Sequence, residues 1–381
     1  MIFTSNSTTQ MPLPLSKVID ADDFEAPELV PYLQEIDAIE SSRMGSRPQD
    51  FVPDSRQWQC AMALRAFDSQ RVACTGHLIA GIGAGTETTI FALARRGALV
   101  FPVDRYLEQS AWSDVAPAGM LVDAAQYSAV DFPTGKVIPV HSSARAVNLP
   151  SDTFDAVFST AAIEHFGSLD NVAAAAREIG RILRPGGVAA IATEFRVEGP
   201  DDRRWFDDSM ILFTPALLEA HVVRPSGLVQ REPLVTEQSD RTFVTRRKLT
   251  DFPDWSTSIQ ALDEKRAVSP SLVVYHDGFL FCAVVLTLYK DHPSPDIVDE
   301  SDRVGARREN AAVAAALERF QRTPQTAGEP VQNHLLFGEV ERLRQENDAL
   351  RALYDRSNAW KHWRALRPAR FVYRRIKRWR G

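Results

Sequence analysis

The sequence lacks the features that mark secreted, disulfide-bonded and membrane-spanning proteins. It has three cysteines, Cys60, Cys74 and Cys282, which form no CxxC pair and no spacing typical of metal ligands, and this favours a reducing compartment. Its longest apolar run, from Phe279 to Tyr289, is too short to cross a bilayer, which takes about 20 residues. The first residues show no basic start followed by an apolar stretch, so no secretory signal is expected. These absences predict a cytoplasmic protein.

Strong compositional bias is also missing, except near the C-terminal end. Of 381 residues, 44% are hydrophobic and 25% are charged, as in ordinary globular proteins. This length allows one large α/β domain with accessory segments, and no set of Asp and His residues is spaced for a divalent metal. The net charge is −6, yet residues 361–381 hold nine Lys or Arg and no acidic residue. An acidic body with a basic tail confines contacts with anionic surfaces to the tail.

The central part of the chain alternates short β-type runs with amphipathic helical stretches over residues 75–291. This alternation predicts a mostly parallel sheet covered by helices on both faces. The seven expected strands lie at residues 77–82, 98–103, 136–140, 155–160, 187–195, 272–275 and 279–289, and the last two form an antiparallel hairpin. The other predicted segments are a flexible leader 1–20, a helical segment 21–74 that packs on the core, a linker with a helix 292–333, a short coiled coil 334–356 and a basic amphipathic tail 357–381.

A glycine-rich turn between the first of these strands and the following helix is the most informative motif. It runs from Ala80 to Glu87 (AGIGAGTE), and the second strand leads to Asp104. Glycines let the backbone turn sharply and approach a ligand, and a carboxylate about 20 residues later is placed to bind ribose hydroxyls. A tight turn with a surface aspartate is the alternative interpretation. Thr88 stands where a dinucleotide motif needs its third glycine, and no GK[ST] follows, so NAD and a P-loop are disfavoured.

Four motifs in the same order resemble those of class I S-adenosylmethionine-dependent methyltransferases. Besides the glycine turn, they are Leu149–Asp155 (LPSDTFD) leading into the fourth strand, Ile163–Phe166 (IEHF) after it and Leu183–Gly187 (LRPGG) before the fifth. The resemblance implies a Rossmann-like, doubly wound α/β fold with a C-terminal helical extension, methyltransferase activity and S-adenosyl-L-methionine as cofactor. It also implies a set of cofactor-binding residues: Gly81, Gly83, Gly85, Glu87, Asp104, Arg105, Ser143, Ala144 and Thr160.

A closer resemblance, over about residues 50–290, is to a methyltransferase subgroup associated with bacterial cell-surface polysaccharide biosynthesis. It rests on Gly81–Glu87, Arg56–Gln59 (RQWQ), Glu164–Leu169 (EHFGSL) and Ala192–Phe195 (ATEF). The resemblance implies that the acceptor is a sugar hydroxyl of a cell-surface glycan or its precursor. Two family positions differ here. Gly81 replaces an acidic residue that contacts the methionine amino group, and no Asp for the adenine amine precedes Leu149, where Ser143 or backbone amides are the candidate replacements.

Three residues are candidates for the acceptor side of the site: His165, Glu164 and Glu194. Methyl transfer to a hydroxyl benefits from a general base near neutral pH, which suits histidine, and by the family's geometry the residues after the fourth strand line the acceptor. His165 is the candidate base, with a structural histidine as the alternative. Glu164 orients the acceptor or His165, or else is a carboxylate favoured at a helix start. Glu194, at the end of the fifth strand, binds acceptor hydroxyls or forms a surface salt bridge.

The C-terminal extension carries two further patterns. A heptad seam with Asn at one central position indicates a short parallel homodimer through residues 336–354, or else a helix packed on the domain. In residues 357–381, aromatic and basic side chains alternate closely. This pattern suits peripheral contact with the anionic inner face of the cell membrane. Nucleic-acid binding is disfavoured because the body is acidic.

The sequence leaves two functions open. The first is an O-methyltransferase that acts on a sugar or glycan acceptor, supported by the glycine turn, Asp104 and the LRPGG segment. The second is a scaffold of glycan-assembly enzymes that binds the cofactor without catalysis, supported by the two missing acidic residues.

Overall fold

The computed structural model describes residues 12–44, 55–108, 112–199, 205–206, 210–242, 272–276 and 278–292. All elements named below belong to one unit of the chain, which comprises Met1–Tyr106 and Asp114–Val313. The predicted linker, coiled coil and basic tail lie outside the described residues, apart from residue 292.

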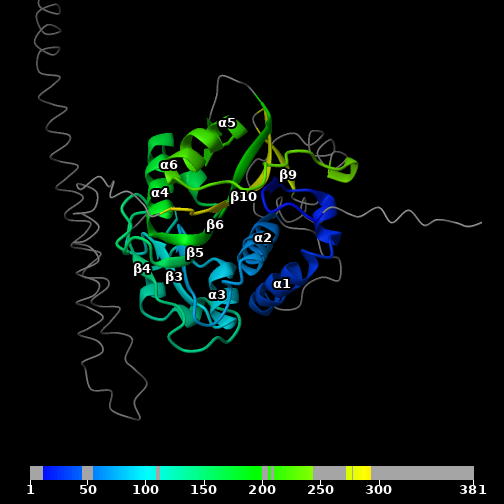
Figure 1. The fold of residues 1–381 in the computed structure, drawn as a ribbon. Coiled ribbons are helices and arrows are strands. Elements are labelled where there is room, and N and C mark those ends of the chain that lie inside the picture. Colours follow the sequence, from blue (N-terminus) through cyan, green and yellow to red (C-terminus); the bar gives the residue numbers. More distant parts are fainter. Residues whose placement is uncertain are drawn as a thin grey trace, which may run out of the picture. The chain divides into compact units, whose positions relative to one another are not determined.

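An eight-stranded sheet forms the centre of this unit (Figure 1). Five strands run parallel in the spatial order β4-β3-β2-β5-β6, β10 is antiparallel to β6, and both β1 and β9 pair with the other edge of β10. The seven predicted strands are present, and β1 is an eighth. The fold is therefore the predicted Rossmann-like, mostly parallel sheet. The bounds are β1 (Lys17–Val18), β2 (Leu78–Ile82), β3 (Leu99–Asp104), β4 (Val140–His141), β5 (Phe154–Thr160), β6 (Leu183–Glu198), β9 (Val273–His276) and β10 (Phe279–Tyr289). A separate two-stranded hairpin is formed by β7 (Trp205–Phe206) and β8 (Met210–Ile211).

Helices cover both faces of the sheet. Figure 1 shows α1 (Val30–Met44), α2 (Ser55–Ser69) and α3 (Thr88–Arg95) on one side, and α4 (Leu169–Ile182), α5 (Pro215–Leu218) and α6 (Arg224–Ser226) on the other. A π-helical turn, η5 (Glu219–Val223), joins α5 to α6. The remaining elements are short 3-10 helices: η1 (Ala21–Glu25), η2 (Ala118–Leu121), η3 (Ala124–Tyr127) and η4 (Ile163–His165).

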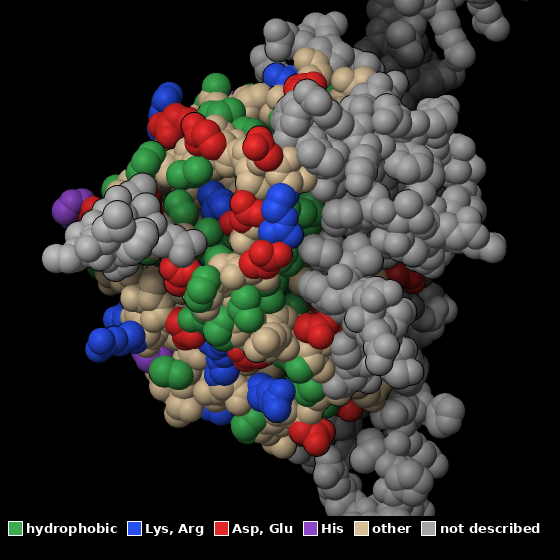
Figure 2. Space-filling model, turned by 90° about the vertical axis from the view of Figure 1, so that its right-hand side faces the viewer, with side chains coloured by type: hydrophobic (Ala, Val, Ile, Leu, Met, Phe, Trp, Pro, Cys, Tyr) green, Lys and Arg blue, Asp and Glu red, His purple; other side chains and the backbone are tan. Residues whose placement is uncertain are grey.

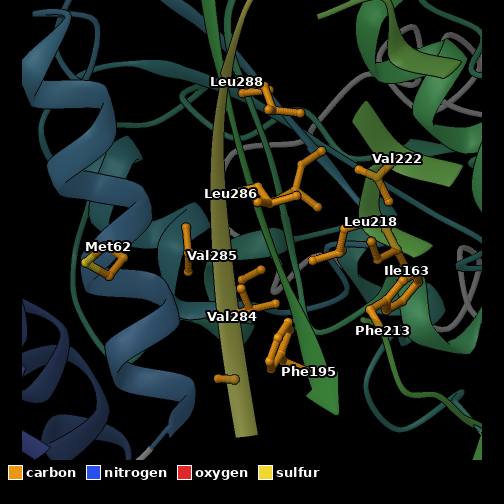
Figure 3. Close-up of a cluster of buried hydrophobic side chains, with 14 of the residues drawn as sticks. Met62, Ile163, Phe195, Phe213, Leu218, Val222, Val284, Val285, Leu286 and Leu288 are labelled. Carbon is orange, nitrogen blue, oxygen red and sulfur yellow. The ribbon is translucent and has the colours of Figure 1, made fainter. Parts of the chain in front are cut away.

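The hydrophobic core lies on both sides of β10, because successive side chains of a strand point to opposite faces. In Figure 3, Val285 points toward Met62 of α2, while Val284 and Leu286 point to the other side, where Leu218 of α5 lies. All of these side chains are buried. The burial of both faces explains why residues 279–289 form a continuous apolar run rather than an alternating one.

The end of the predicted leader is part of the sheet rather than flexible. Val18 and Ile19 are buried, and the backbone N–H of Ile19 donates to Ala283 O at 2.9 Å. The Lys17 ammonium is buried and pairs with Asp23, whose carboxylate also accepts from Trp58 Nε1 at 2.9 Å. The prediction of a flexible leader over residues 1–20 is therefore wrong for its last residues, because β10 supplies them with a pairing edge.

The described surface is mixed in charge. On the face shown in Figure 2, acidic and basic side chains are interspersed over the described residues. Each helix in the described part of the chain is too short or too polar to cross a lipid bilayer.

Candidate functional site

The glycine turn lies between the carboxyl end of β2 and the start of α3. Gly83 and Gly85 have φ angles of +66° and +46°, a region that favours glycine. A Cβ atom on Gly83 would lie 2.7 Å from the Cβ of Ala162, and one on Gly85 would lie 2.5 Å from Val115 O. The turn therefore requires glycine at both positions, and it packs directly against the segment that follows β5.

Asp104, the last residue of β3, faces this turn. Its Oδ2 accepts from Gly85 N at 2.8 Å, and its Oδ1 accepts from Arg105 N at 2.7 Å. Burial raises the pKa of Asp104, while the two backbone donors oppose that rise. A carboxylate offers about four acceptor positions, so Asp104 keeps capacity for ribose hydroxyls beside the turn.

Residues 142–145 lie next to Asp104, where the sequence predicts the adenine side of the site. The backbone N–H of Ser142 donates to Asp104 O at 3.0 Å, and Ser143 Oγ accepts from Arg145 N at 3.3 Å. Ser143 and Ala144 are half-buried, while Arg105 is exposed. Ser143 and Ala144 thus share the sheet edge with Asp104.

The carboxyl end of β5 contributes Thr160 and the strained residue after it. Thr160 is buried, and its Oγ1 has no hydrogen-bond partner among the described residues. Ala161 has a φ angle of +44°, a strained conformation for a residue with a Cβ that is enriched at functional sites. The chain then forms η4, which contains Glu164 and His165. The buried Thr160 hydroxyl can therefore form a hydrogen bond with a polar ligand at this edge of the sheet.

Glu164 and Glu194 are placed around β6. The buried Glu164 accepts from Thr193 Oγ1 at 2.8 Å. Glu194 follows Thr193 along β6, so its side chain lies on the opposite face of the strand. It pairs with Ala283 of β10, which shares a face with Val285, and Val285 points toward α2 in Figure 3. Glu194 therefore lies on the α2 side of the sheet. The half-buried His165 lies next to Glu164 on η4. Glu164 is thus oriented by Thr193.

The environment raises the pKa values of both carboxyl groups. Burial raises the pKa of Glu164 to about 7, although hydrogen bonds from its own backbone and Thr193 and the charge of Arg56 oppose this. Burial and then the nearby charge of Glu164 raise the pKa of Glu194 to about 8. Both values lie near neutrality, where a carboxyl group exchanges protons most effectively in catalysis.

No sequence pattern predicts a role for Arg56, although it belongs to the RQWQ segment that resembles the methyltransferase subgroup. Arg56, in the first turn of α2, donates from Nη1 to Glu87 Oε2 at 2.8 Å and to Thr160 O at 3.2 Å. The Glu87 Oε1 atom accepts from Cys60 Sγ at 3.1 Å. The charge of Glu87 above all raises the pKa of Arg56, while burial opposes the rise. Arg56 therefore stays charged and joins the glycine turn to the end of β5.

The residues present fit S-adenosylmethionine. The turn leaves no room for a Cβ at Gly83 or Gly85, Asp104 offers a carboxylate that could accept hydrogen bonds from ribose hydroxyls, and the Thr160 hydroxyl has no partner among the described residues. The ends of β2, β3 and β5 meet where the strand order changes direction, which is where open α/β sheets bind ligands. Among the described residues, no group of three or more His, Cys, Asp or Glu could hold a metal ion.

Comparison with known proteins agrees with this geometry. Residues 80–191 match the family model described as a methyltransferase domain. The matched residues lie within the predicted methyltransferase domain, and the match together with the fit of the site supports the predicted cofactor, S-adenosylmethionine. No curated protein matches the sequence.

Several solved methyltransferase structures are similar to this chain at low identity. One is the putative methyltransferase of Haloferax volcanii in complex with the Trm112 activator, with 19% identity, a TM-score of 0.39, and coverage of 71% of this chain and 97% of that one. Another is Haemonchus contortus phosphoethanolamine N-methyltransferase 2 in complex with S-adenosyl-L-methionine, with 18% identity, a TM-score of 0.41, and coverage of 72% and 61%. At these levels of similarity, the acceptors of these enzymes carry no argument for this chain.

Proposed function

Because residues 80–191 match the methyltransferase-domain model and the site fits S-adenosylmethionine, we propose that the protein methylates a sugar hydroxyl of a cell-surface glycan or its precursor. The observation that carries the hydroxyl part of this proposal is the pair of carboxyl groups, Glu164 and Glu194, whose pKa values are raised and which act electrostatically on Arg56. Carboxyl groups bind sugar hydroxyls by accepting their hydrogen bonds, and a group with a pKa near neutrality accepts the proton that a hydroxyl loses.

Each part of the site has a separate task in this proposal. Asp104 holds the ribose, Ser143 and the backbone around Ala144 contact the adenine side, and the glycine turn allows close approach of the ligand. When bound, S-adenosylmethionine supplies a methyl group on a positively charged sulfur. The protein then has to position the acceptor in line with that group and to remove its proton.

Proton removal is assigned to the acceptor-side residues. As the acceptor oxygen forms its bond to the methyl group, its O–H bond breaks and the proton passes to a base. Two residues are candidates: His165, which the sequence indicates, and Glu194, whose pKa of about 8 leaves a minor ionised fraction at neutral pH that grows as the pH rises. Glu164, held by Thr193, raises the pKa of Glu194 through its charge and so tunes that second candidate.

The glycan acceptor rests on the sequence resemblance to polysaccharide-associated methyltransferases. The test is methyl transfer from labelled S-adenosylmethionine to cell-envelope extracts, followed by hydrolysis and mass analysis of the sugars. We expect O-methylated sugars with the wild type and none with the Asp104→Asn control. Label on proteins or on lipid amines, or no label at all, would contradict the proposal.

A specific observation favours a second candidate function, a cofactor-binding scaffold without catalysis. Gly81 lacks the acidic side chain expected there, and the ring of Phe158 fills that space. A protein of this kind binds S-adenosylhomocysteine but transfers no methyl group to any envelope fraction. The labelled-methyl experiment therefore separates the two functions.

The sequence also supports two proposals about residues outside the described part of the chain. We propose homodimerisation through residues 336–354 and peripheral contact with an anionic membrane through residues 357–381. Removing residues 357–381 should abolish salt-sensitive binding to anionic vesicles and leave activity on a soluble acceptor intact. Vesicle binding that is indifferent to lipid charge would contradict this proposal.

A further inference from the structure

The position of the missing acidic residue is closed by an aromatic ring. A Cβ atom on Gly81 would lie 2.4 Å from Phe158 Cζ and 2.9 Å from the Cβ of Ala84. Contacts below 3 Å force a neighbour to move, and Phe158 is fully buried in β5. A carboxylate therefore has no place at position 81, and the group that neutralises a bound ammonium must come from elsewhere in the chain.

Glu87 supplies a carboxylate at the opposite end of the same turn. It is the N-cap residue of α3, and its backbone N–H donates to Ala84 O at 2.9 Å, which closes the turn. Its side chain is 10% exposed and is held by Arg56 at 2.8 Å and Cys60 at 3.1 Å. The carboxylate is thus fixed beside the turn instead of extending into solvent.

Arg56 places a cation at the same point. Its Nη1 contacts both Glu87 Oε2 and Thr160 O, so it bridges the elements that follow β2 and β5. These strands are neighbours in the sheet, and Asp104 lies at the end of β3, on the other side of β2. A ligand whose nucleoside lies at Asp104 and that extends across the glycine turn therefore reaches Arg56, Glu87 and Thr160 with its other end.

The charges of this cluster match a zwitterion. Arg56 and Glu87 form one ion pair, and the raised pKa values of Glu164 and Glu194 limit the negative charge that these two carboxyl groups add near neutral pH. An amino-acid group carries one positive and one negative charge, so its binding leaves the net charge of the cluster unchanged. The buried Thr160 Oγ1, without a partner among the described residues, gives that group a further hydrogen-bonding partner.

We propose that Arg56 and Glu87 form the subsite for the amino-acid end of the cofactor, with the guanidinium binding its carboxylate and Glu87 binding its ammonium. Arginine suits this task because its planar donors match a carboxylate in a bidentate arrangement. Glu87 thereby takes over the contact that the family places at the position of Gly81. The inference rests on the proposed cofactor but is independent of the acceptor.

Two nucleosides that differ only at this end provide the test. S-adenosylhomocysteine carries the amino-acid group, and 5′-methylthioadenosine lacks it, so calorimetry with both ligands isolates the subsite. We expect the full-length wild type to prefer S-adenosylhomocysteine. Glu87→Gln and Arg56→Gln should each lower its affinity about 10- to 100-fold, as expected for a charged hydrogen bond, while binding of 5′-methylthioadenosine stays unchanged. Arg56→Lys, which keeps the charge but loses the planar donors, should fall between.

Two controls make the result specific. Arg184 matches Arg56 in exposure, with side-chain exposed fractions of 45% and 44%, and also forms an ion pair, with Asp155 at 2.6 Å. Arg184→Gln should change neither affinity, whereas Asp104→Asn should weaken both ligands. Thermal unfolding establishes that each variant is folded.

Each outcome has one meaning. An unchanged preference for S-adenosylhomocysteine in both folded variants would overturn the inference while leaving the proposed function intact. Equal loss of both ligands in these variants would also overturn it, because the residues would then act on the whole site. Wild-type protein that binds neither nucleoside would refute the cofactor itself, a result distinct from the other two.

Discussion

Thr193 donates its hydroxyl hydrogen to the carboxyl group of Glu164 at 2.8 Å. The next residue along β6 is Glu194, and the charge of Glu164 raises the pKa of its carboxyl group. Strand β6 thus holds the carboxyl group of Glu164 by a hydrogen bond on one face and carries Glu194 on the other. Neither group has its ordinary pKa of 4.5 in the folded protein.

The raised pKa values predict how stability depends on pH. Between the ordinary pKa of 4.5 and the raised values of about 7 and 8, the folded state binds more protons than the unfolded state. The free energy of unfolding should therefore fall as the pH rises through this range. Glu194→Gln should flatten that fall. Urea unfolding between pH 5 and 9 measures it, and a variant with the wild-type pH slope would show that Glu194 has no raised pKa.

The two candidate bases predict different rate profiles. Loss of the true base should lower turnover about 10²- to 10⁴-fold, the usual contribution of a general base, with affinity for S-adenosylhomocysteine nearly unchanged. If Glu194 is the base, Glu194→Gln has this effect, and the wild-type rate rises with pH to a plateau above about 8, its folded-state pKa. If His165 is the base, His165→Ala has the effect instead. Equal loss of cofactor affinity would mark either residue as structural.

The buried ammonium of Lys290 should be important for stability. Its Nζ donates to Gly180 O at 2.7 Å and to Leu183 O at 2.6 Å, at the carboxyl end of α4, and pairs with Asp152. Lys290→Met leaves these acceptors buried without a donor, which should cost about 1–3 kcal/mol of unfolding free energy. The control Arg224→Gln removes an exposed ion pair and should cost about 0–1 kcal/mol. Similar midpoints in chemical denaturation would contradict this account of Lys290.

The contact between position 81 and Phe158 predicts a paired effect. Gly81→Ala places a Cβ atom 2.4 Å from the ring and should destabilise the protein by about 1–3 kcal/mol, the usual cost of overpacking. Phe158→Leu removes ring atoms from that space, so the double variant should be more stable than the sum of the single effects predicts. Simple additivity of the two changes in a denaturation cycle would refute the steric explanation.

The sheet was predictable because its signals are local. Residues 78–82, 99–104 and 154–160 are short apolar runs, each a strand in the structure, and the alternation with helices determines their parallel order. Strand β1 was not predictable, since Lys17 and Val18 form no pattern of their own and owe their conformation to β10.

The candidate site divides in the same way. The glycine turn and Asp104 are separated by a fixed spacing along the chain, which the sequence displays. The contacts of Arg56 with Glu87 and Thr160 join residues from three separate elements. The spacing of these residues along the sequence gives no sign of the contacts. The orientation of Glu164 by Thr193 depends likewise on tertiary packing.

The pairing of β1 with β10 also determines when this domain finishes folding during synthesis. The backbone N–H of Thr287 donates to Ser16 Oγ at 3.0 Å across 271 residues of sequence, and contacts of such long range slow folding. A growing chain cannot close this edge of the sheet until β10 has left the ribosome. Until then, residues 15–19 remain without their strand partner, so the domain completes its fold only after β10 has been translated.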